Sequence, residues 1–544
     1  MTPDFALEKA AAQQVEDALG HGALVEAKQA SDAEHAQTLG EALRIYRKAI
    51  GWSILVSLSV IMEGYDTDLI GNFYAYPSFA RKYGHYYAPS NDWQIATAWQ
   101  TGLGMASTVG AIFGGVMNGQ LCARFGYRRV MMVSLVFMAA FIFIVFFATS
   151  LPVLLVGEIL CGFSWGVFAT VGPAYASEVC PTVLRGYLCT YVNLCWAIGQ
   201  LIAAGVLDGL VNNKGEWAYR IPFAVQWVWP VPLLVGCFLM PESPWYLVRK
   251  DRLEEAKHSL RRLSSRSEDA INGQLAMMVH TSRLEAQLEA GARYSDCFRG
   301  IDLRRTEIAC VAFAGQVLTG STFAYSPTYF FENAGMDSTQ AYKLNVGSTS
   351  LYFVGTVLSW WLITYVGRRT IYVWGQFALC CTLLIVGIIS AASGSKGALW
   401  AQAAFVFLWG LIYSLTLGPV TYSIIAEISS VRLRPLTVCL ARTTYQLVNI
   451  ITQVLEPKFM SPTAWNAKGK TAFFWACTCF LMFLWSFFRL PEPKGRTYEE
   501  LDLLFQRKIP ARQFSSTQID AYALHSSSQE GLTGQEVPVQ ETEK

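Results

Sequence analysis

Twelve windows of about 20 apolar residues limit what this chain can fold into, because a helix of that length crosses a hydrocarbon core roughly 30 Å thick. The windows form two sets of six, and a charged segment separates the sets. They lie near 49–72, 94–118, 130–149, 151–175, 187–210, 222–240, 307–331, 344–365, 371–392, 400–425, 436–456 and 471–489. We therefore expect an all-α integral membrane protein with twelve transmembrane helices.

The composition agrees with a membrane protein and argues against nucleic-acid binding. Charged residues make up 15% of the chain, against about 25% in soluble domains. The formal net charge of +2 lacks the basic excess of nucleic-acid binders. The 13 cysteines fit no zinc spacing or disulfide framework, so we interpret them as small buried hydrophobic residues. No cleavable signal peptide is visible, so the first transmembrane helix is expected to direct insertion.

The charge pattern predicts five segments. They are a tail at 1–48, a helix bundle at 49–240, a charged linker with amphipathic helices at 241–305, a second bundle at 306–490 and a tail at 491–544. The outermost parts of the tails, 1–45 and 506–544, are polar, and we expect them to be mobile. An even number of spans puts both termini on one side, and the Arg and Lys residues of the linker predict that this side is the cytosol.

Three sequence motifs occur once in each half. "RFGYRR" (124–129) and "YVGRR" (365–369) each follow the second span of a set. Glu178 precedes Arg185 by seven residues, and Glu427 precedes Arg434 by the same spacing. "PESPWYL" and "PEPKGRTYEELD" follow the two sets. The chain is therefore predicted to contain two parallel six-helix repeats, with a substrate site near the midplane between them.

These motifs, together with "GYDTDLIG", "PAYASEVCPTVLRG" and "GPVTYSIIAEISSVRLR", carry a family resemblance. Across residues 48–505 the chain resembles the sugar porters of the major facilitator superfamily. The run "RGYLCTYVNLCWAIGQLIAAGVL" (185–207) is similar to fungal maltose and other α-glucoside permeases. The resemblance implies a major facilitator fold, sugar transport by alternating access and a position in the plasma membrane.

The resemblance also implies a cytosolic gate of charged residues. In the family these residues interlock when the carrier faces outward and separate when it faces inward. An acidic residue that often accompanies the arginine motif is absent, with Ala123 and Thr364 at those places, so the gate is expected to be weaker here. The matching residues are Arg128, Arg129, Glu178, Arg185 and Glu242 in the first half, and Arg368, Arg369, Glu427, Arg434 and Glu492 in the second.

Four polar or aromatic residues match sugar-contacting positions of the family: Gln200, Gln316, Asn449 and Tyr422. A sugar needs amide side chains for its hydroxyl groups and an aromatic ring for its apolar face. The alternative is that these amides hold neighbouring helices together, which is common in membrane bundles. Gly315, Leu417 and Tyr352 depart from the monosaccharide pattern, and these changes suit a longer ligand such as a disaccharide.

Carboxyl groups occur inside the predicted membrane core. Glu63 and Asp66 share a helix face, and Asp66 lies about 25 Å along the first span from Ala49. An Asp at a helix centre costs about 2.5–3.5 kcal/mol even on lenient scales, so such a residue usually has a function. Asp68 lies nearer the outer end, and we expect it to meet the headgroup region.

By resemblance, Asp66 takes up and releases the coupling proton. The family's usual Arg partner in the fourth span is replaced here by Glu158. Two neighbouring carboxylates disfavour joint ionisation, which favours a shared proton. Arg442 is the positive candidate, with snorkelling to the cytosolic face as the alternative.

The sequence thus predicts a proton-coupled importer of maltose or a related α-glucoside. Its partners are expected to be the sugar, the proton and membrane lipid, with no nucleic acid, and the carrier is expected to be a monomer. The alternatives are a carrier of lactose, cellobiose or a hexose, a uniporter, and a transporter-like sugar sensor. A membrane enzyme is not expected, because no catalytic or metal-ligand constellation occurs in the spans, and no cofactor is implied.

Overall fold

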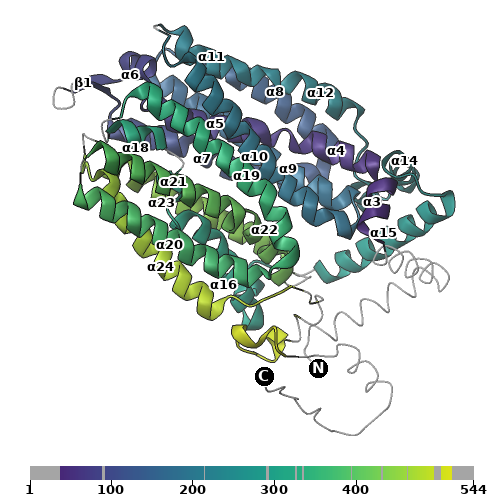
Figure 1. The fold of residues 1–544 in the computed structure, drawn as a ribbon. Coiled ribbons are helices and arrows are strands. Elements are labelled where there is room, and N and C mark those ends of the chain that lie inside the picture. The colour runs from purple at the N-terminus through teal and green to yellow at the C-terminus, as the bar shows by residue number, and fades with distance from the viewer. Residues whose placement is uncertain are drawn as a thin grey trace.

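The computed structural model describes residues 37–87, 92–213, 215–289, 293–324, 327–333, 336–393, 395–429, 433–461, 464–494, 496, 501 and 504–517. Its helices form two bundles that lie side by side (Figure 1). We call the end that carries helices α13 (Pro244–Arg249), α14 (Leu253–Leu263) and α15 (Glu268–Glu289) the linker face. The opposite end carries a hairpin of β1 (His85–Tyr87) and β2 (Asp92–Gln94), and we call it the hairpin face (Figure 1).

The first bundle contains six transmembrane segments. The first is broken into α4 (Arg47–Ser57) and α5 (Val60–Phe73), and the sixth into α11 (Trp217–Val225), η1 (Gln226–Val228) and α12 (Pro230–Leu239). The four unbroken helices are α7 (Thr97–Phe125), α8 (Tyr127–Phe146), α9 (Leu151–Val179) and α10 (Thr182–Leu210). A short helix, α6 (Pro77–Tyr83), leads into the hairpin.

The second bundle repeats this order. Its first segment is broken into α16 (Gly300–Leu318), α17 (Ser321–Ala324) and α18 (Pro327–Asn333), and its fourth into α21 (Lys396–Leu415) and α22 (Leu417–Ile428). The other four segments are α19 (Ser338–Tyr365), α20 (Arg368–Ala392), α23 (Arg434–Met460) and α24 (Thr471–Arg489), the last preceded by η3 (Lys468–Lys470).

Length and apolarity support the expected number of spans. Within the described ranges, nine helical segments are long and apolar enough to cross a membrane, and the bent pair Leu39–Ile45 and Arg47–Phe73 raises this number to ten. Helices α7 and α23, of 29 and 27 residues, are equally long but more polar. Asn449 of α23 donates a hydrogen bond to Thr108 of α7 (3.4 Å), so these two helices face each other between the bundles, where polar side chains are shielded from lipid.

Parts of both ends that we expected to be mobile are folded against the linker face. Thr38 and Glu41 form a capping box that begins α3 (Leu39–Ile45), and the backbone N–H of Ser265 donates to the Ile45 carbonyl (3.0 Å). At the other end, η4 (Ala511–Gln513) lies in a segment whose Phe505 and Phe514 are buried. The Arg304 guanidinium lies over both rings, at 5.3 and 5.7 Å from their centroids.

Two glycines allow α5 and α10 to pack backbone to backbone. A Cβ added at Gly64 would collide with the Trp196 carbonyl of α10, and one added at Gly199 would collide with the Ile61 carbonyl of α5. Close approach through small residues is the usual way in which helices associate where no hydrophobic driving force exists between them. Gly64 lies two residues from Asp66 and Gly199 precedes Gln200, so this contact fixes both candidate site residues.

We predict that Gly199→Leu destabilises the protein, because its side chain would overlap the α5 backbone. Overpacking of this kind costs on the order of 1–3 kcal/mol or more, so the melting temperature in detergent should fall by several degrees. Gly205→Leu is the control on the same helix, since a Cβ there meets nothing within 4 Å. Thermal unfolding of the two purified variants measures the difference, and equal melting temperatures would contradict the packing account.

Candidate functional site

A pair of acidic side chains is buried inside the first bundle. Asp66 of α5 and Glu158 of α9 are 2% and 1% exposed, and their carboxyl groups interact with each other inside the bundle. Gln226 of η1 donates from Nε2 to the Asp66 Oδ1 atom (2.5 Å). The sequence predicts a role for the two acids but not for Gln226. The sequence signal for Gln226 is only that it is a single amide within the apolar sixth span.

Glu63 has a different surrounding from Asp66, although the two residues are one turn apart on α5. Its electrostatic partner is Arg442 of α23, in the other bundle. The Arg442 guanidinium donates to the Tyr422 hydroxyl (3.2 Å) and lies 5.1 Å from the Tyr445 ring centroid. Arg442 therefore points among aromatic side chains of the second bundle, which argues against snorkelling to the membrane surface.

Asp68 is not exposed to lipid headgroups, so the expectation that it meets them was wrong. Its side chain is 3% exposed, and its Oδ2 atom accepts a hydrogen bond from Nδ2 of Asn345 on α19 (3.3 Å). Helices α5 and α19 belong to different bundles. The carboxyl group is therefore enclosed between the bundles, on the hairpin side of Asp66.

One further buried carboxyl was missed from the sequence. Glu456 lies in the last turn of α23, at the end of an apolar window, and accepts a hydrogen bond from Nε1 of Trp475 on α24 (2.8 Å). Both helices belong to the second bundle, so this bond joins neighbours within one repeat. No cluster of His, Cys, Asp and Glu able to hold a metal ion occurs in the part of the chain that the structure describes.

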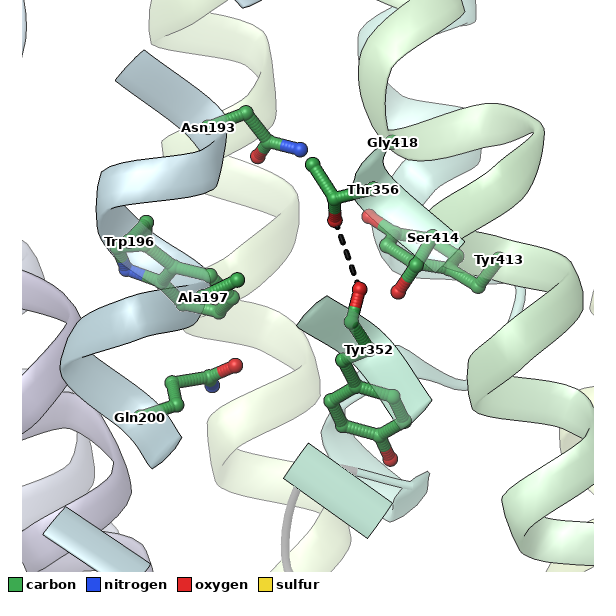
Figure 2. Close-up of a pocket in the computed structure, with 9 residues that line it drawn as sticks. All are labelled: Asn193, Trp196, Ala197, Gln200, Tyr352, Thr356, Tyr413, Ser414 and Gly418. Atoms are coloured by element: carbon green, nitrogen blue, oxygen red, sulfur yellow. Dashed lines mark hydrogen bonds between the residues drawn. The ribbon is translucent and has the colours of Figure 1, made fainter. Parts of the chain in front are cut away.

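A pocket lies where α10 of the first bundle faces α19, α21 and α22 of the second. It is lined by Asn193, Trp196, Ala197, Gln200, Tyr352, Thr356, Tyr413, Ser414 and Gly418. Figure 2 shows the amides of Asn193 and Gln200 extending from α10 toward α19. The Oε1 atom of Gln200 is buried and has no hydrogen-bond partner among the described residues, which leaves an acceptor for a ligand hydroxyl.

The structure brings only one of the four predicted sugar residues, Gln200, into this pocket. Gln316 donates from Nε2 to the carbonyls of Leu417 and Gly418 (3.2 and 2.9 Å), so it braces the break between α21 and α22 beside the pocket. Asn449 bonds to α7, as described above. Tyr422 is 44% exposed, packs edge-on against Phe313 and is not among the pocket-lining residues.

Asn193 was missed, although a sequence signal for it existed. It precedes Gln200 by seven residues, which is two helical turns and places both amides on one face of α10. Tyr352, which departs from the monosaccharide pattern, packs its ring against Gly410 and donates its hydroxyl to the Ala324 carbonyl (3.2 Å).

The gate residues of the first half form a closed network. Glu242 accepts hydrogen bonds from the backbone N–H groups of Tyr127 and Ser243 (3.0 and 3.1 Å). Burial raises the pKa of Glu242, while the backbone N–H groups act in the opposite direction. Glu178 accepts from the Tyr127 hydroxyl (3.0 Å), from the Ser243 hydroxyl and from Arg249, a residue of α13 that sequence reasoning missed.

The second half repeats this network. Glu492 accepts from the backbone N–H groups of Arg368 and Arg369 (2.8 and 3.1 Å), and Glu427 accepts from the Arg368 guanidinium (3.2 Å). Arg128 bonds to the Phe238 carbonyl, and Arg129 is exposed. The side chains of Arg185 and Arg434 lie outside the described residues. Among the described gate residues, these hydrogen bonds and ion pairs stay within their own bundle or the linker beside it.

Comparison with known proteins agrees with this architecture. The family model described as "Sugar (and other) transporter" matches residues 52–505. A maltose permease of Saccharomyces cerevisiae is 39% identical over 508 residues, which cover 92% of this chain and 83% of the relative. A general alpha-glucoside permease of the same species is 37% identical over 527 residues, covering 94% and 84%.

Solved structures show the same fold at lower identity. The proton:xylose symporter XylE bound to 6-bromo-6-deoxy-D-glucose superimposes with a TM-score of 0.69 at 20% identity, over 85% of this chain and 99% of that one. The inward open conformation of XylE from E. coli gives a TM-score of 0.66 at 20% identity, over 84% and 99%. The chain therefore belongs to the sugar transporter family, and it is a transporter of the twelve-helix major facilitator fold rather than an enzyme.

Proposed function

We propose that this transporter imports an α-glucoside disaccharide, such as maltose, together with a proton. The observation that carries the choice of a disaccharide is the pair of amides on α10. Asn193 and Gln200 both line the pocket and lie about 10 Å apart along the helix axis, a separation comparable to the length of two linked pyranose rings. The names of the relatives, a maltose permease and alpha-glucoside permeases, support this substrate class.

The remaining lining residues suit the same ligand. Trp196 and Tyr413 offer aromatic faces for apolar ring surfaces, and Thr356 and Ser414 offer hydroxyl groups. Gly418 keeps space open between Tyr413 and Asn193, since a Cβ there would lie 3.5 Å from the Tyr413 carbonyl.

We place the linker face in the cytosol and the hairpin face outside the cell, at the plasma membrane, with the monomer as the working unit. The gate networks on the linker face are separate, whereas bonds between the bundles occur from the middle toward the hairpin face, as in Asn449 to Thr108 and Asn345 to Asp68. A carrier whose bundles are joined on the outside, and whose two cytosolic gate networks are separate, faces inward. The family's interlocked and separated gate states support this assignment.

For the proton, we propose Asp66 as the carrier, with Glu158 and Gln226 shaping its site and Glu63 and Arg442 linking it to the other bundle. Burial without a cation favours the neutral form of an acid, and the adjacent Glu158 carboxyl disfavours joint ionisation. The Glu63–Arg442 interaction spans the two bundles, so rocking of the bundles changes the field around α5.

We predict that Asn193→Ala and Gln200→Ala each raise the KM for maltose by roughly 2- to 10-fold, the loss expected from one neutral hydrogen bond. Gln340→Ala is the control, because this exposed amide lies on α19 outside the pocket. Uptake of labelled maltose in transporter-free cells, with unlabelled disaccharides and hexoses as competitors, measures the effect. Glucose competing as strongly as maltose would contradict a disaccharide site.

We predict that Asp66→Asn abolishes uphill accumulation and sugar-induced alkalinisation of the medium, while counterflow exchange survives. The amide is nearly isosteric with the carboxyl group, and other residues line the sugar pocket. Glu456→Gln is the control, because that carboxyl is equally buried but bonded within the second bundle. A pH electrode records proton entry on sugar addition. An Asp66→Asn carrier that still alkalinises the medium would disprove the assignment.

We predict that Glu178→Gln lowers uptake about tenfold at near-normal membrane abundance, since a hydrogen bond to a charged group is worth about 1.5–3 kcal/mol. The amide keeps the size of the side chain but weakens the bond to Arg249. It also weakens the contact with the other half's gate residues that the family makes when the carrier faces outward. Glu255→Gln removes an exposed pair with Arg252 in the linker and should have little effect. Uptake is measured against surface expression, and unchanged uptake by Glu178→Gln would contradict a gating role.

A further inference from the structure

A layer of polar side chains joins the two bundles near the hairpin face. We call Asp68 and Asn72 of α5 together with Tyr342 and Asn345 of α19 the outer gate. The Tyr342 hydroxyl donates to the Asn72 carbonyl (2.6 Å), and Asn345 Nδ2 donates to Asp68 Oδ2 (3.3 Å). Tyr342 also packs edge-on against Tyr76, with ring centroids 5.4 Å apart. These contacts must break when the bundles separate on that side.

Asp68 is the acidic member of the outer gate, and the structure gives it no cation among the described residues. The titratable groups that interact with it are Tyr65 on its own helix and Tyr342 and Tyr352 of α19. Other acids lie on the same or adjacent elements: Asp66 on α5, Glu158 on α9, Asp208 in the last turn of α10 and Glu332 on α18. A buried carboxylate with only neutral and acidic neighbours is strongly disfavoured.

Two amide oxygen atoms near Asp68 lack a hydrogen-bond donor in the described part of the chain, which favours the protonated form of the Asp68 carboxyl group. The Oδ1 atoms of Asn345 and Asn72 are both buried and have no hydrogen-bond partner among the described residues. A carboxylate has no proton to give them, whereas a carboxylic acid can donate its O–H to an amide oxygen while it accepts the amide N–H. The neutral acid and Asn345 can thus form two hydrogen bonds with each other, whereas the carboxylate forms only one with Asn345 beside its interaction with the Asn72 amide.

We propose that Asp68 is a second proton-binding site, and that the outer gate closes when Asp68 is protonated and pairs with Asn345. The inference rests on the proposed function for one point, namely that the hairpin face is external. The proton comes from the external medium while the gate is open, converting the carboxylate to the acid. It returns to that medium when the gate reopens, so it does not cross the membrane and does not replace the proton carried by Asp66.

The closed state can be measured without any sugar. Thr339 of α19 and Asn212, which follows α10, lie across the bundle interface near the outer gate, and the Thr339 hydroxyl donates to Asn212 Oδ1 (3.4 Å). In the double variant Asn212→Cys/Thr339→Cys, oxidation joins the bundles when the gate is closed. After protease cleavage of the linker, joined halves migrate as one band and separate halves as two. An Asp66→Asn background removes the contribution of the coupling site.

With Asp68 present, we expect the closed-to-open ratio to rise on acidification by up to about tenfold per pH unit, the limit for one controlling proton. In Asp68→Asn, the side chain is always neutral and has nearly the same size as the native carboxyl group. The rise on acidification should therefore be lost. Thiol oxidation is itself pH dependent, but the same cysteine pair is used in both proteins, so the ratio of their profiles isolates Asp68. Identical profiles would overturn the proposal.

An exchange of the two side chains provides the second measurement. Asn345→Asp places two carboxyl groups face to face, so closure should require more acid and its midpoint should shift to lower pH. The combination Asp68→Asn/Asn345→Asp again pairs one acid with one amide and should restore the wild-type profile; failure to do so in a folded, monodisperse protein overturns the proposal.

Measurement of sugar-induced proton entry distinguishes a failure of this proposal from a failure of the proposed function. In the otherwise native carrier, Asp68→Asn should retain sugar-induced proton entry, which Asp66→Asn loses, and loss of proton entry in Asp68→Asn would contradict separate roles. Failure of sugar uptake in every variant, with pH-dependent cross-linking intact, would count against the proposed function alone.

Discussion

The high free energy of a bare charge in a membrane interior is the constraint on which the rest of this structure depends. Because each buried carboxyl group requires a hydrogen-bond donor, a proton or a cation, the acids specify which helices meet. Asp66 accepts from Gln226 and so joins the first span to the sixth, while Asp68 accepts from Asn345 and joins the two bundles. Glu456 accepts from Trp475 and ties α23 to α24. Acids bonded inside one bundle can keep their partners while the bundles rock, whereas Asp68 cannot.

Backbone geometry then sets how finely these side chains are placed. Glycines at 64 and 199 let α5 and α10 touch, so the buried carboxyl pair and the pocket beside Gln200 share one closely packed helix pair. Gln316 donates hydrogen bonds to the carbonyl groups of Leu417 and Gly418 in the first turn of α22, and so fixes the start of that helix after the break. Interrupted helices at the midplane are typical of transporter binding sites, and here the interruption supplies Gly418 to the pocket wall.

The sequence predicted the fold well because its signals are local. Apolar windows depend on length and composition alone, and the repeated motifs around Arg128, Glu178, Arg368 and Glu427 recur at matching places in the two halves. The partners of buried groups were harder, since nothing local joins Asp68 to Asn345 or Asp66 to Gln226. Tyr422 and Asn449, which match family sugar positions, do not line this pocket, and their roles stay predictions, because a motif carries residue identity but not side-chain direction. Phe505 and Phe514 lie in a tail whose average composition is polar, so nothing in the sequence indicated that they are buried. The structure gives the reason, because Arg304 of α16 covers both rings.

The contacts on the linker face lie within one bundle, whereas contacts on the hairpin face join the two bundles. This difference allows one proton to bias a large motion. On the linker face, Glu242 and Glu492 bond to backbone N–H groups of their own repeats, so these contacts persist in both conformers and contribute nothing to the bias. Only interactions present in one conformer shift the equilibrium. On the hairpin face the hydrogen bonds from Tyr342 to the Asn72 carbonyl and from Asn345 to Asp68 cross between the bundles, so each of these two contributes fully to the closed state. Moving an equilibrium from 1:99 to 99:1 takes about 5.5 kcal/mol, and a few buried bonds that form only on closure are of the right size to supply it. Placing one of them on an acid makes the conformational balance depend on the proton, whichever sugar is bound.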